Sequence, residues 1–149
     1  LLGESIPKNL MVKAISGLGK CYIGLNQFKE LTELINTLED NIKKESEIVD
    51  LIKSKDYLEN MDVQEDSELE KKLKKNPNDL NTRYELAKSQ IINKNYSEAI
   101  NNLLFIIEKN KGWKNNKAKT ELLNMFSLLG DSDPLTMEGR LRLSNLIFK

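Results

Sequence analysis

The chain has 149 residues, enough for a single compact domain or a short stack of helical hairpins with a continuous core. Lys and Arg together number 23, as do Asp and Glu, so no net charge draws the chain to a nucleic acid or an anionic membrane. There is no histidine, which removes the usual general base and the commonest metal ligand. We therefore expect no catalysis, no cofactor, no metal and no nucleic-acid partner.

Cys21 is the only cysteine, so neither an internal disulfide nor a Cys-x-x-Cys pair can form, and a reducing, cytoplasmic location is expected. The longest apolar runs, such as 103–107, are far shorter than the roughly 20 residues that span a bilayer. We expect no membrane segment. The chain opens with Leu1-Leu2-Gly3, without an initiator Met or a signal pattern, which suggests a segment of a longer protein.

Apolar residues recur at helical spacing, and Pro7, Pro77 and Pro134 fall where helices begin or have just ended. The pattern predicts four helical hairpins in one domain, at about 8–38, 44–75, 79–110 and 115–148. In the first hairpin, the residues expected to point inward from the first helix are Leu10, Ala14, Ile15, Leu18, Tyr22 and Leu25. After the break at Asn26-Gln27, those of the second helix are Leu31, Leu34, Ile35 and Leu38. No stretch alternates with period two beside turn glycines, so no strand is expected.

The second predicted hairpin pairs residues 47–58 with residues 67–75 across an acidic, loose join at 60–66. The third is the clearest, with an apolar face on each of its two helices. The fourth has Leu122, Leu123, Phe126 and Leu129 inward, then a last helix with Leu141, Leu143, Leu146 and Ile147 partly inward. Gly130 is placed to end one of these helices, and Asp133 with Pro134 to begin the other.

Two segments of the chain repeat one pattern. Phe28 and Tyr96 occupy the same place in them and lie 68 residues apart, twice the 34-residue period of tetratricopeptide repeats. The small residues Gly19 and Ala87 are expected to let the second helix of each hairpin approach closely. The middle repeat is degenerate, with Lys53 in place of the small residue. The expected fold is an all-α, tetratricopeptide-like solenoid.

Further motifs follow in a fixed order along residues 69–148. They are Asn76-Pro77-Asn78-Asp79, Tyr84-Glu85-Leu86-Ala87, Tyr96-Ser97-Glu98-Ala99, Leu103-Leu104 with Ile106-Ile107, Gly112-Trp113, Lys119 with Leu122-Leu123 and Phe126, Leu129-Gly130, Asp133-Pro134, and Gly139-Arg140-Leu141-Arg142-Leu143. In this order they resemble the C-terminal segment of thioredoxin-fused bacterial tetratricopeptide co-chaperones, the chaperedoxins. Upstream, Gly17-Leu18-Gly19-Lys20-Cys21-Tyr22 resembles the first repeat of that family.

The resemblance implies a protein that holds unfolded clients and passes them to the chaperonin or to the seventy-kilodalton heat-shock chaperone. The family's N-terminal thioredoxin domain is absent from this chain, and any cysteine chemistry would belong there. A competing hypothesis is a generic tetratricopeptide scaffold for complex assembly, with one defined partner and no preference for unfolded protein. The enzyme hypothesis is a phosphate site at Gly17 to Lys20.

Partner-binding residues are expected on the first helices of the hairpins, which line the inner groove of such a solenoid. The repeat positions place Lys13, Ser16, Lys20 and Ile23 there, and Asn81, Tyr84, Lys88 and Ile91 from the third hairpin. This surface suits an acidic or extended peptide, or is simply a solvated face. The family resemblance adds Arg140 and Arg142 of the terminal motif as candidates.

Several features have plainer explanations. The spacing of Gly17, Gly19 and Gly24 fits neither a dinucleotide fingerprint nor a Walker loop, so helix packing is preferred. Cys21 is expected to be buried, and Trp113 to pack on the helix that follows it rather than to anchor a partner. The lysines of 71–75 are read as a solvated face.

Overall fold

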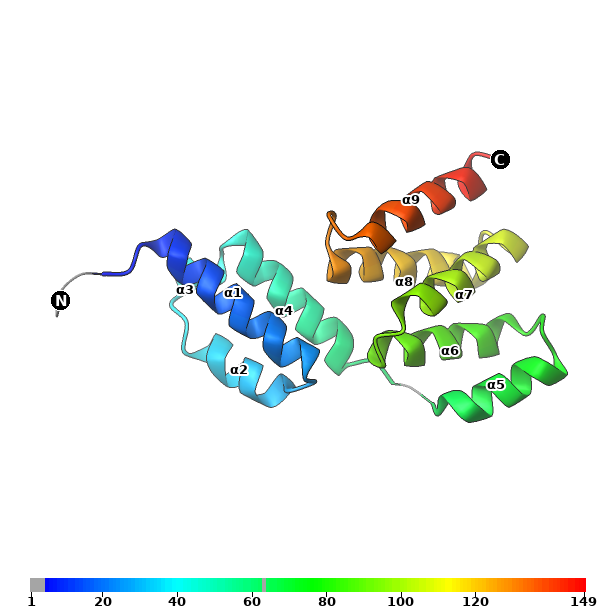
Figure 1. The fold of residues 1–149 in the computed structure, drawn as a ribbon, viewed down its shortest axis with the longest axis horizontal. Coiled ribbons are helices and arrows are strands. Elements are labelled where there is room, and N and C mark those ends of the chain that lie inside the picture. The colour runs from blue at the N-terminus through cyan, green and yellow to red at the C-terminus, as the bar shows by residue number, and fades with distance from the viewer. Residues whose placement is uncertain (1–4, 63) are drawn as a thin grey trace. The chain divides into compact units, whose positions relative to one another are not determined.

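The structure is a computed structural model, and it describes residues 5–62 and 64–149. Every regular element in these residues is an α-helix, and successive helices pack in pairs, which confirms the predicted all-α, tetratricopeptide-like array. The chain divides into two compact units, residues 1–60 and residues 61–149. Figure 1 labels the helices of each unit.

The first unit contains α1 (Lys8–Gly24), α2 (Phe28–Asn36), α3 (Asp40–Lys43) and α4 (Ser46–Glu59). α1 packs against both α2 and α4, and α2 and α3 also contact α4. The buried side chains of Val12, Ile42 and Ile48 form a core cluster, which Ile15, Leu38 and Ile52 surround. The core of this unit therefore lies on one side of α1.

Gly19 allows α1 and α4 to approach closely. A Cβ atom at Gly19 would lie 2.7 Å from Cδ1 of Leu51 and 3.0 Å from its Cγ, too close for ordinary contact. The prediction that Gly19 is a packing residue is confirmed, but its partner is different. The helix that approaches it is α4, not α2, the second helix of its own hairpin.

The outer side of α1 corrects several expectations. Leu10, Ala14, Leu18 and Leu25 were predicted to point inward and are exposed. Cys21, predicted to be buried, is exposed as well. The reason is that α2 and α4 cover only the side of α1 that carries its buried residues, so a helix that is apolar nearly all round keeps one face uncovered.

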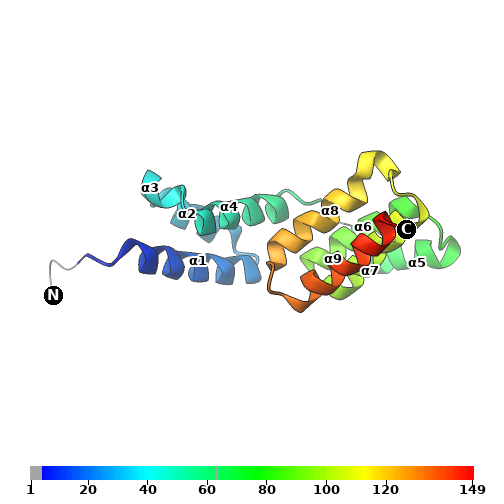
Figure 2. The same cartoon turned by 90° about the horizontal axis from the view of Figure 1, so that it is seen from above.

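The second unit contains α5 (Asp66–Lys75), α6 (Leu80–Ile92), α7 (Tyr96–Lys109), α8 (Trp113–Leu129) and α9 (Pro134–Ile147). α7 is central and contacts α6, α8 and α9, while α5 packs on α6. Figure 2 shows the helices of this unit from a second direction. The fully buried side chains are mostly apolar and include Leu69, Ile91, Leu103, Ile106, Leu122, Met125 and Phe126.

The helices predicted to form the second hairpin belong to different units. α4 packs against α1 in the first unit, and α5 packs against α6 in the second. The predicted join at 60–66 includes Val63, which lies outside the described residues, as does the opening Leu1-Leu2-Gly3.

The two repeat turns have the same backbone structure at positions 68 residues apart. Asn26 and Lys94 both adopt left-handed φ values, 56° and 63°. In each turn the next residue donates its N–H to a carbonyl five positions back, Gln27 to Tyr22 at 2.8 Å and Asn95 to Gln90 at 2.7 Å. This is a Schellman-type helix ending. Each turn delivers an aromatic residue, Phe28 or Tyr96, as the first residue of the next helix.

The last hairpin begins and ends largely as predicted. Gly130 has φ +91° and ends α8, while Oδ1 of Asp133 accepts a hydrogen bond from the N–H of Leu135, 2.8 Å away, at the start of α9. Two inward predictions are wrong, because Leu123 and Leu141 are exposed. Leu143 is buried, and Leu146 and Ile147 are half-buried.

Candidate protein-binding site

Tyr84 is the centre of a cluster that joins α6 to α8. Its side chain is 4% exposed, and its ring centroid lies 5.4 Å from that of Trp113. Its hydroxyl lies 3.5 Å from Oε2 of the buried Glu121. Burial raises the pKa of Tyr84, and the negative charges of Glu121 and Glu85 raise it further. The phenol is therefore neutral at physiological pH.

Lysines surround these two aromatic rings. The Nζ atoms of Lys117 and Lys88 lie 4.9 Å and 5.3 Å from the Tyr84 ring centroid, and Nζ of Lys114 lies 4.9 Å from that of Trp113. Lys114 also donates a hydrogen bond to Oδ1 of Asn81, 2.5 Å away. We call this set the Tyr84 cluster; its members are Asn81, Tyr84, Lys88, Trp113, Lys114, Lys117 and Glu121.

Local backbone structure positions the α8 members of the Tyr84 cluster. Lys114, Asn115 and Asn116 all have left-handed φ values of 44° to 64°, so the right-handed part of α8 begins at Lys117, close to the predicted start near 116. This turn places Trp113 against Tyr84 of α6, so Trp113 packs on a neighbouring helix rather than on its own.

The structure brings together the groove residues predicted on α6. Asn81, Tyr84 and Lys88 all belong to the Tyr84 cluster. Nζ of Lys88 is held 2.8 Å from Oε2 of Glu85 and 3.1 Å from the carbonyl oxygen of Asp62. Lys117 and Glu121 of α8 were not predicted. They lie four residues apart on one face of the right-handed part of α8, and this spacing is the signal that could have pointed to them.

The other groove candidates, Lys13 and Lys20, lie on α1 in the first unit. Both are exposed. The residues of the hypothetical phosphate site, Gly17 to Lys20, lie inside the continuous helix α1. Their backbone N–H groups make the hydrogen bonds of the helix and are not available to a phosphate.

The two arginines of the terminal motif make different contacts. Nη2 of Arg140 lies 2.7 Å from Oδ1 of Asp131, and its guanidinium lies 5.8 Å from the Phe126 ring centroid. Nη1 of Arg142 donates to Oδ1 of Asn101 on α7, 2.8 Å away. Arg142 also lines a groove of about 370 Å³ between α7 and α9, together with Leu104, Phe105 and Leu146.

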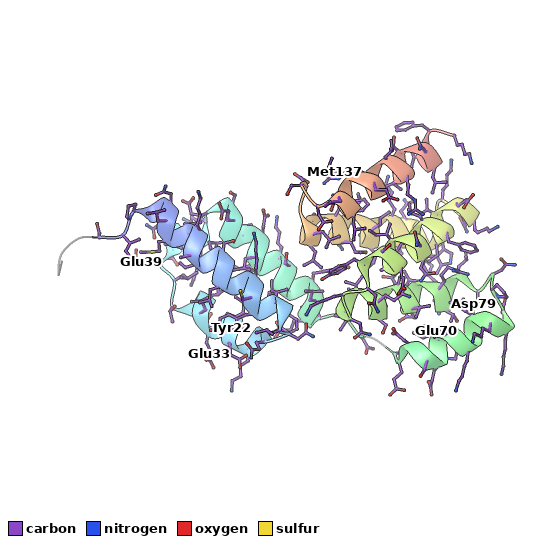
Figure 3. The ribbon with its side chains drawn as sticks, in the orientation of Figure 1. Tyr22, Glu33, Glu39, Glu70, Asp79 and Met137 are labelled. Carbon is purple, nitrogen blue, oxygen red and sulfur yellow. The ribbon has the colours of Figure 1, made fainter. Side chains whose placement is uncertain are left out.

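α9 and Phe148, which directly follows it, expose a row of large apolar side chains. Met137, Leu141 and Phe148 are 62%, 63% and 85% exposed, and Figure 3 labels Met137 near the start of the helix. Gly139 faces the opposite way, because a Cβ atom there would lie 2.6 Å from Cε1 of Phe126. The terminal motif thus turns Gly139 and Leu143 inward and leaves Leu141 outward.

Residues 5–62 and 64–149 contain neither a metal site nor a membrane span. Within these residues no three His, Cys, Asp or Glu side chains are placed to hold a metal ion. No helix in the same residues is both long enough and apolar enough to cross a bilayer.

The structure is that of a helical-repeat domain. Its helices are paired, its left-handed turn is repeated, and one helix face carries aromatic and cationic side chains. The sequence model of the tetratricopeptide repeat family matches residues 59–148, more than half of the chain. The chain belongs to the tetratricopeptide repeat family. Its tetratricopeptide region is therefore of a type that generally acts as a protein–protein interaction module and is typically not catalytic.

The chain is also similar to longer mycobacterial proteins. The uncharacterized protein Mb1359 of Mycobacterium bovis and the uncharacterized proteins MT1366 and Rv1324 of Mycobacterium tuberculosis are each 26% identical to it over 70 residues. The matched segment is 47% of this chain and 23% of each relative, so it spans about a quarter of their length. No solved structure matches the chain.

Proposed function

We propose that this chain is the protein-binding part of a co-chaperone of the thioredoxin-fused tetratricopeptide type. It holds unfolded client proteins in the cytoplasm and docks to the chaperonin or to the seventy-kilodalton heat-shock chaperone. The resemblance of residues 69–148 to that family supports the proposal, as does membership of a family of interaction modules.

The observation that carries the docking part of the proposal is the exposed apolar row of α9. Met137 and Leu141 point outward from α9, whose buried residues are Thr136, Gly139 and Leu143, and Phe148 extends the exposed row directly after the helix. A large apolar side chain that stays in water favours association, because burying it against a partner releases about 1.5–3 kcal/mol. Arg142 beside this row bonds the neutral Asn101 and supplies a charge that orients an acidic partner, whereas the charge of Arg140 is paired with Asp131.

Client holding is assigned to the Tyr84 cluster. Its half-buried Trp113 and its lysines offer aromatic contact and positive charge on the α6–α8 face, which suits an extended segment with acidic and aromatic side chains. Many weak contacts of this kind hold a client without selecting one sequence. Lys88 is fixed by Glu85, so Lys114 and Lys117 are the cations that meet the client.

Co-sedimentation with the bacterial chaperonin at low and moderate salt tests the docking surface. We expect the chain to bind, and the double variant Met137→Ser with Leu141→Ser to lose most of this binding. Leu123→Ser is the matched control, because Leu123 is an equally apolar, exposed residue on α8 and its loss should leave binding intact. Equal binding of both variants, or no binding of the unaltered chain, would contradict the proposed docking surface.

A further inference from the structure

The side of α1 that faces away from α2 and α4 is a continuous apolar surface. Relative to Leu10, the residues at +4, +7, +8, +11 and +15 fall on one face of a helix. These residues form what we call the α1 stripe: Leu10, Ala14, Gly17, Leu18 and Cys21 on α1, and Leu25 directly after it. All six are exposed, and Leu10, Leu18 and Leu25 are 53%, 45% and 68% exposed. An uncovered apolar face of this length is a mark of an interaction site.

Free positive charge lies along one edge of the α1 stripe. α1 contains Lys8, Lys13 and Lys20 and no acidic residue. Nζ of Lys8 is 2.5 Å from Oε1 of Glu45. Lys13 and Lys20 are exposed, lie seven residues apart on the same edge, and pair with no acid in the part of the chain that the structure describes. The stripe is therefore bordered by two unneutralised cations two helical turns apart.

We propose that the α1 stripe binds an amphipathic helix of a partner protein, whose apolar face covers Leu10, Leu18 and Leu25 and whose two acidic residues, two turns apart, meet Lys13 and Lys20. This inference concerns the first unit and does not depend on the docking surface of α9. Charge complementarity sets the register of the bound helix, and the apolar stripe provides most of its affinity.

The small residues of the stripe favour a helix over a lipid surface. A Cβ atom added at Gly17 would meet nothing within 4 Å, and Ala14 lies one turn before it, so a partner helix can approach closely between Leu10 and Leu18. A helix that lies on a membrane would benefit from bulky residues there and from lysines along its polar side. Here the second edge of the stripe carries Met11 and Ile15 instead.

Charge also argues against a second copy of this chain. A two-fold antiparallel pair of α1 helices would place the same edge of both helices together. Lys13 and Lys20 of one copy would then face the lysines of the other, and like charges in contact weaken association. An acid-bearing helix has no such conflict.

The test uses two helical peptides of about 18 residues, or five turns, each with leucines on one face. One carries two glutamates seven residues apart beside the leucines, and the other carries lysines at those positions. We expect the full chain to bind the acidic peptide about tenfold more tightly, because two favourable ion pairs replace two repulsions. Lys13→Glu with Lys20→Glu should reverse this preference.

Lys29→Glu with Lys53→Glu is the matched control, since both lysines are exposed in the same unit and the charge change is identical. This variant should keep the original preference. Binding should also protect Cys21, the only cysteine, from alkylation, and Leu18→Ser should weaken binding while circular dichroism stays unchanged.

Three outcomes would overturn the inference. The first is an unchanged peptide preference after Lys13 and Lys20 are reversed, or full Cys21 reactivity in the presence of the bound peptide. The second is co-flotation of the chain with anionic phospholipid vesicles and no peptide binding, which would assign the stripe to a membrane surface. The third is a dimer in sedimentation velocity that Leu18→Ser dissolves, which would assign the stripe to a second copy.

Discussion

Gly17 and Gly19 lie two residues apart on α1 but in opposite surroundings. A Cβ at Gly17 would enter open space, whereas a Cβ at Gly19 would press on the buried Leu51. Gly17→Ala should stabilise the chain by about 0.5–1 kcal/mol, because alanine restricts the unfolded chain and favours the helix. Gly19→Ala should be about 1–3 kcal/mol less stable than Gly17→Ala, because it overpacks the α1–α4 contact. Urea denaturation of both variants measures the difference, and equal stabilities would contradict the close approach of α1 and α4.

Asp79 caps α6 and is expected to make the second unit sensitive to acid. The hydroxyl of Thr82 donates to its Oδ2 at 2.7 Å and the N–H of Thr82 to its Oδ1 at 3.1 Å, and these bonds hold the pKa of Asp79 below its usual range. A carboxyl that is more acidic when folded stabilises the fold above its ordinary pKa of about 3.9, and this contribution is lost as pH falls through the lowered value.

Asp79→Ala should therefore cost about 1 kcal/mol of stability at neutral pH, and progressively less as the pH falls below the ordinary aspartate pKa of about 3.9. Asp79→Asn is the control, because asparagine keeps the capping oxygen and does not titrate. Unfolding curves at several pH values provide the test. A cost of Asp79→Ala that stays constant down to low pH would show that the carboxylate is not the stabilising form.

At the scale of single residues, the apolar periodicity of a helix predicted buried positions well only where another helix covers its apolar face. Leu31 fits the predicted apolar pattern and is buried, while Leu10 and Leu18 fit the pattern of their own helix and are exposed. Val12, which was not among the residues predicted to point inward, is buried instead. Helical spacing tells which residues share a face, but not whether another element covers that face.

A network of side-chain hydrogen bonds links α6 to α7. Asn102 of α7 accepts a hydrogen bond from Nη1 of Arg83, 2.9 Å away, and donates one to Oε1 of Gln90, 2.8 Å away. The guanidinium of Arg83 stacks 3.8 Å from the Phe105 ring centroid, and burial lowers the pKa of Arg83. The buried Nε atom of Arg83 has no partner among the described residues, so the loss of Asn102 would leave a second nitrogen of the same guanidinium unpaired.

Asn102→Ala should destabilise the second unit by about 1–3 kcal/mol, since it leaves buried polar groups of Arg83 and Gln90 unpaired. Asn101→Ala is the matched control, because Asn101 is exposed and its side-chain bond among the described residues is to the exposed Arg142. This variant should change stability by no more than about 0.5 kcal/mol. Denaturant unfolding followed by circular dichroism compares the two. Similar losses in both variants would mean that the network adds nothing beyond a surface contact.

At the scale of elements, the sequence predicted the repeat turns because their chemistry is local. Phe28 and Tyr96 begin α2 and α7, and Gly130 ends α8. Helix partners were harder to predict, since periodicity shows that a helix has an apolar face but not which helix meets it. α6 and α7, expected to form the third hairpin, pack against each other, whereas α4 packs against α1 and α5 against α6.

For the molecule as a whole, the repeat period and the motif order were enough to predict the family fold. The candidate site was only partly predicted. The repeat positions predicted Asn81, Tyr84 and Lys88. Trp113 and Lys117 reach these residues through the left-handed turn at 114–116, and the repeat pattern does not encode this turn. The exposed rows of α1 and α9 follow from what packs around each helix, which no single sequence pattern reveals.

The central claim is that this tetratricopeptide domain holds proteins in their unfolded state. The most direct measurement compares its binding to one test protein kept permanently unfolded and to the same protein folded. We predict binding of the unfolded form alone, weakened by Lys114→Glu with Lys117→Glu and unaffected by Lys71→Glu with Lys72→Glu on the exposed face of α5. Equal binding of both forms, or binding of neither, would contradict the co-chaperone proposal and favour a scaffold with one defined partner.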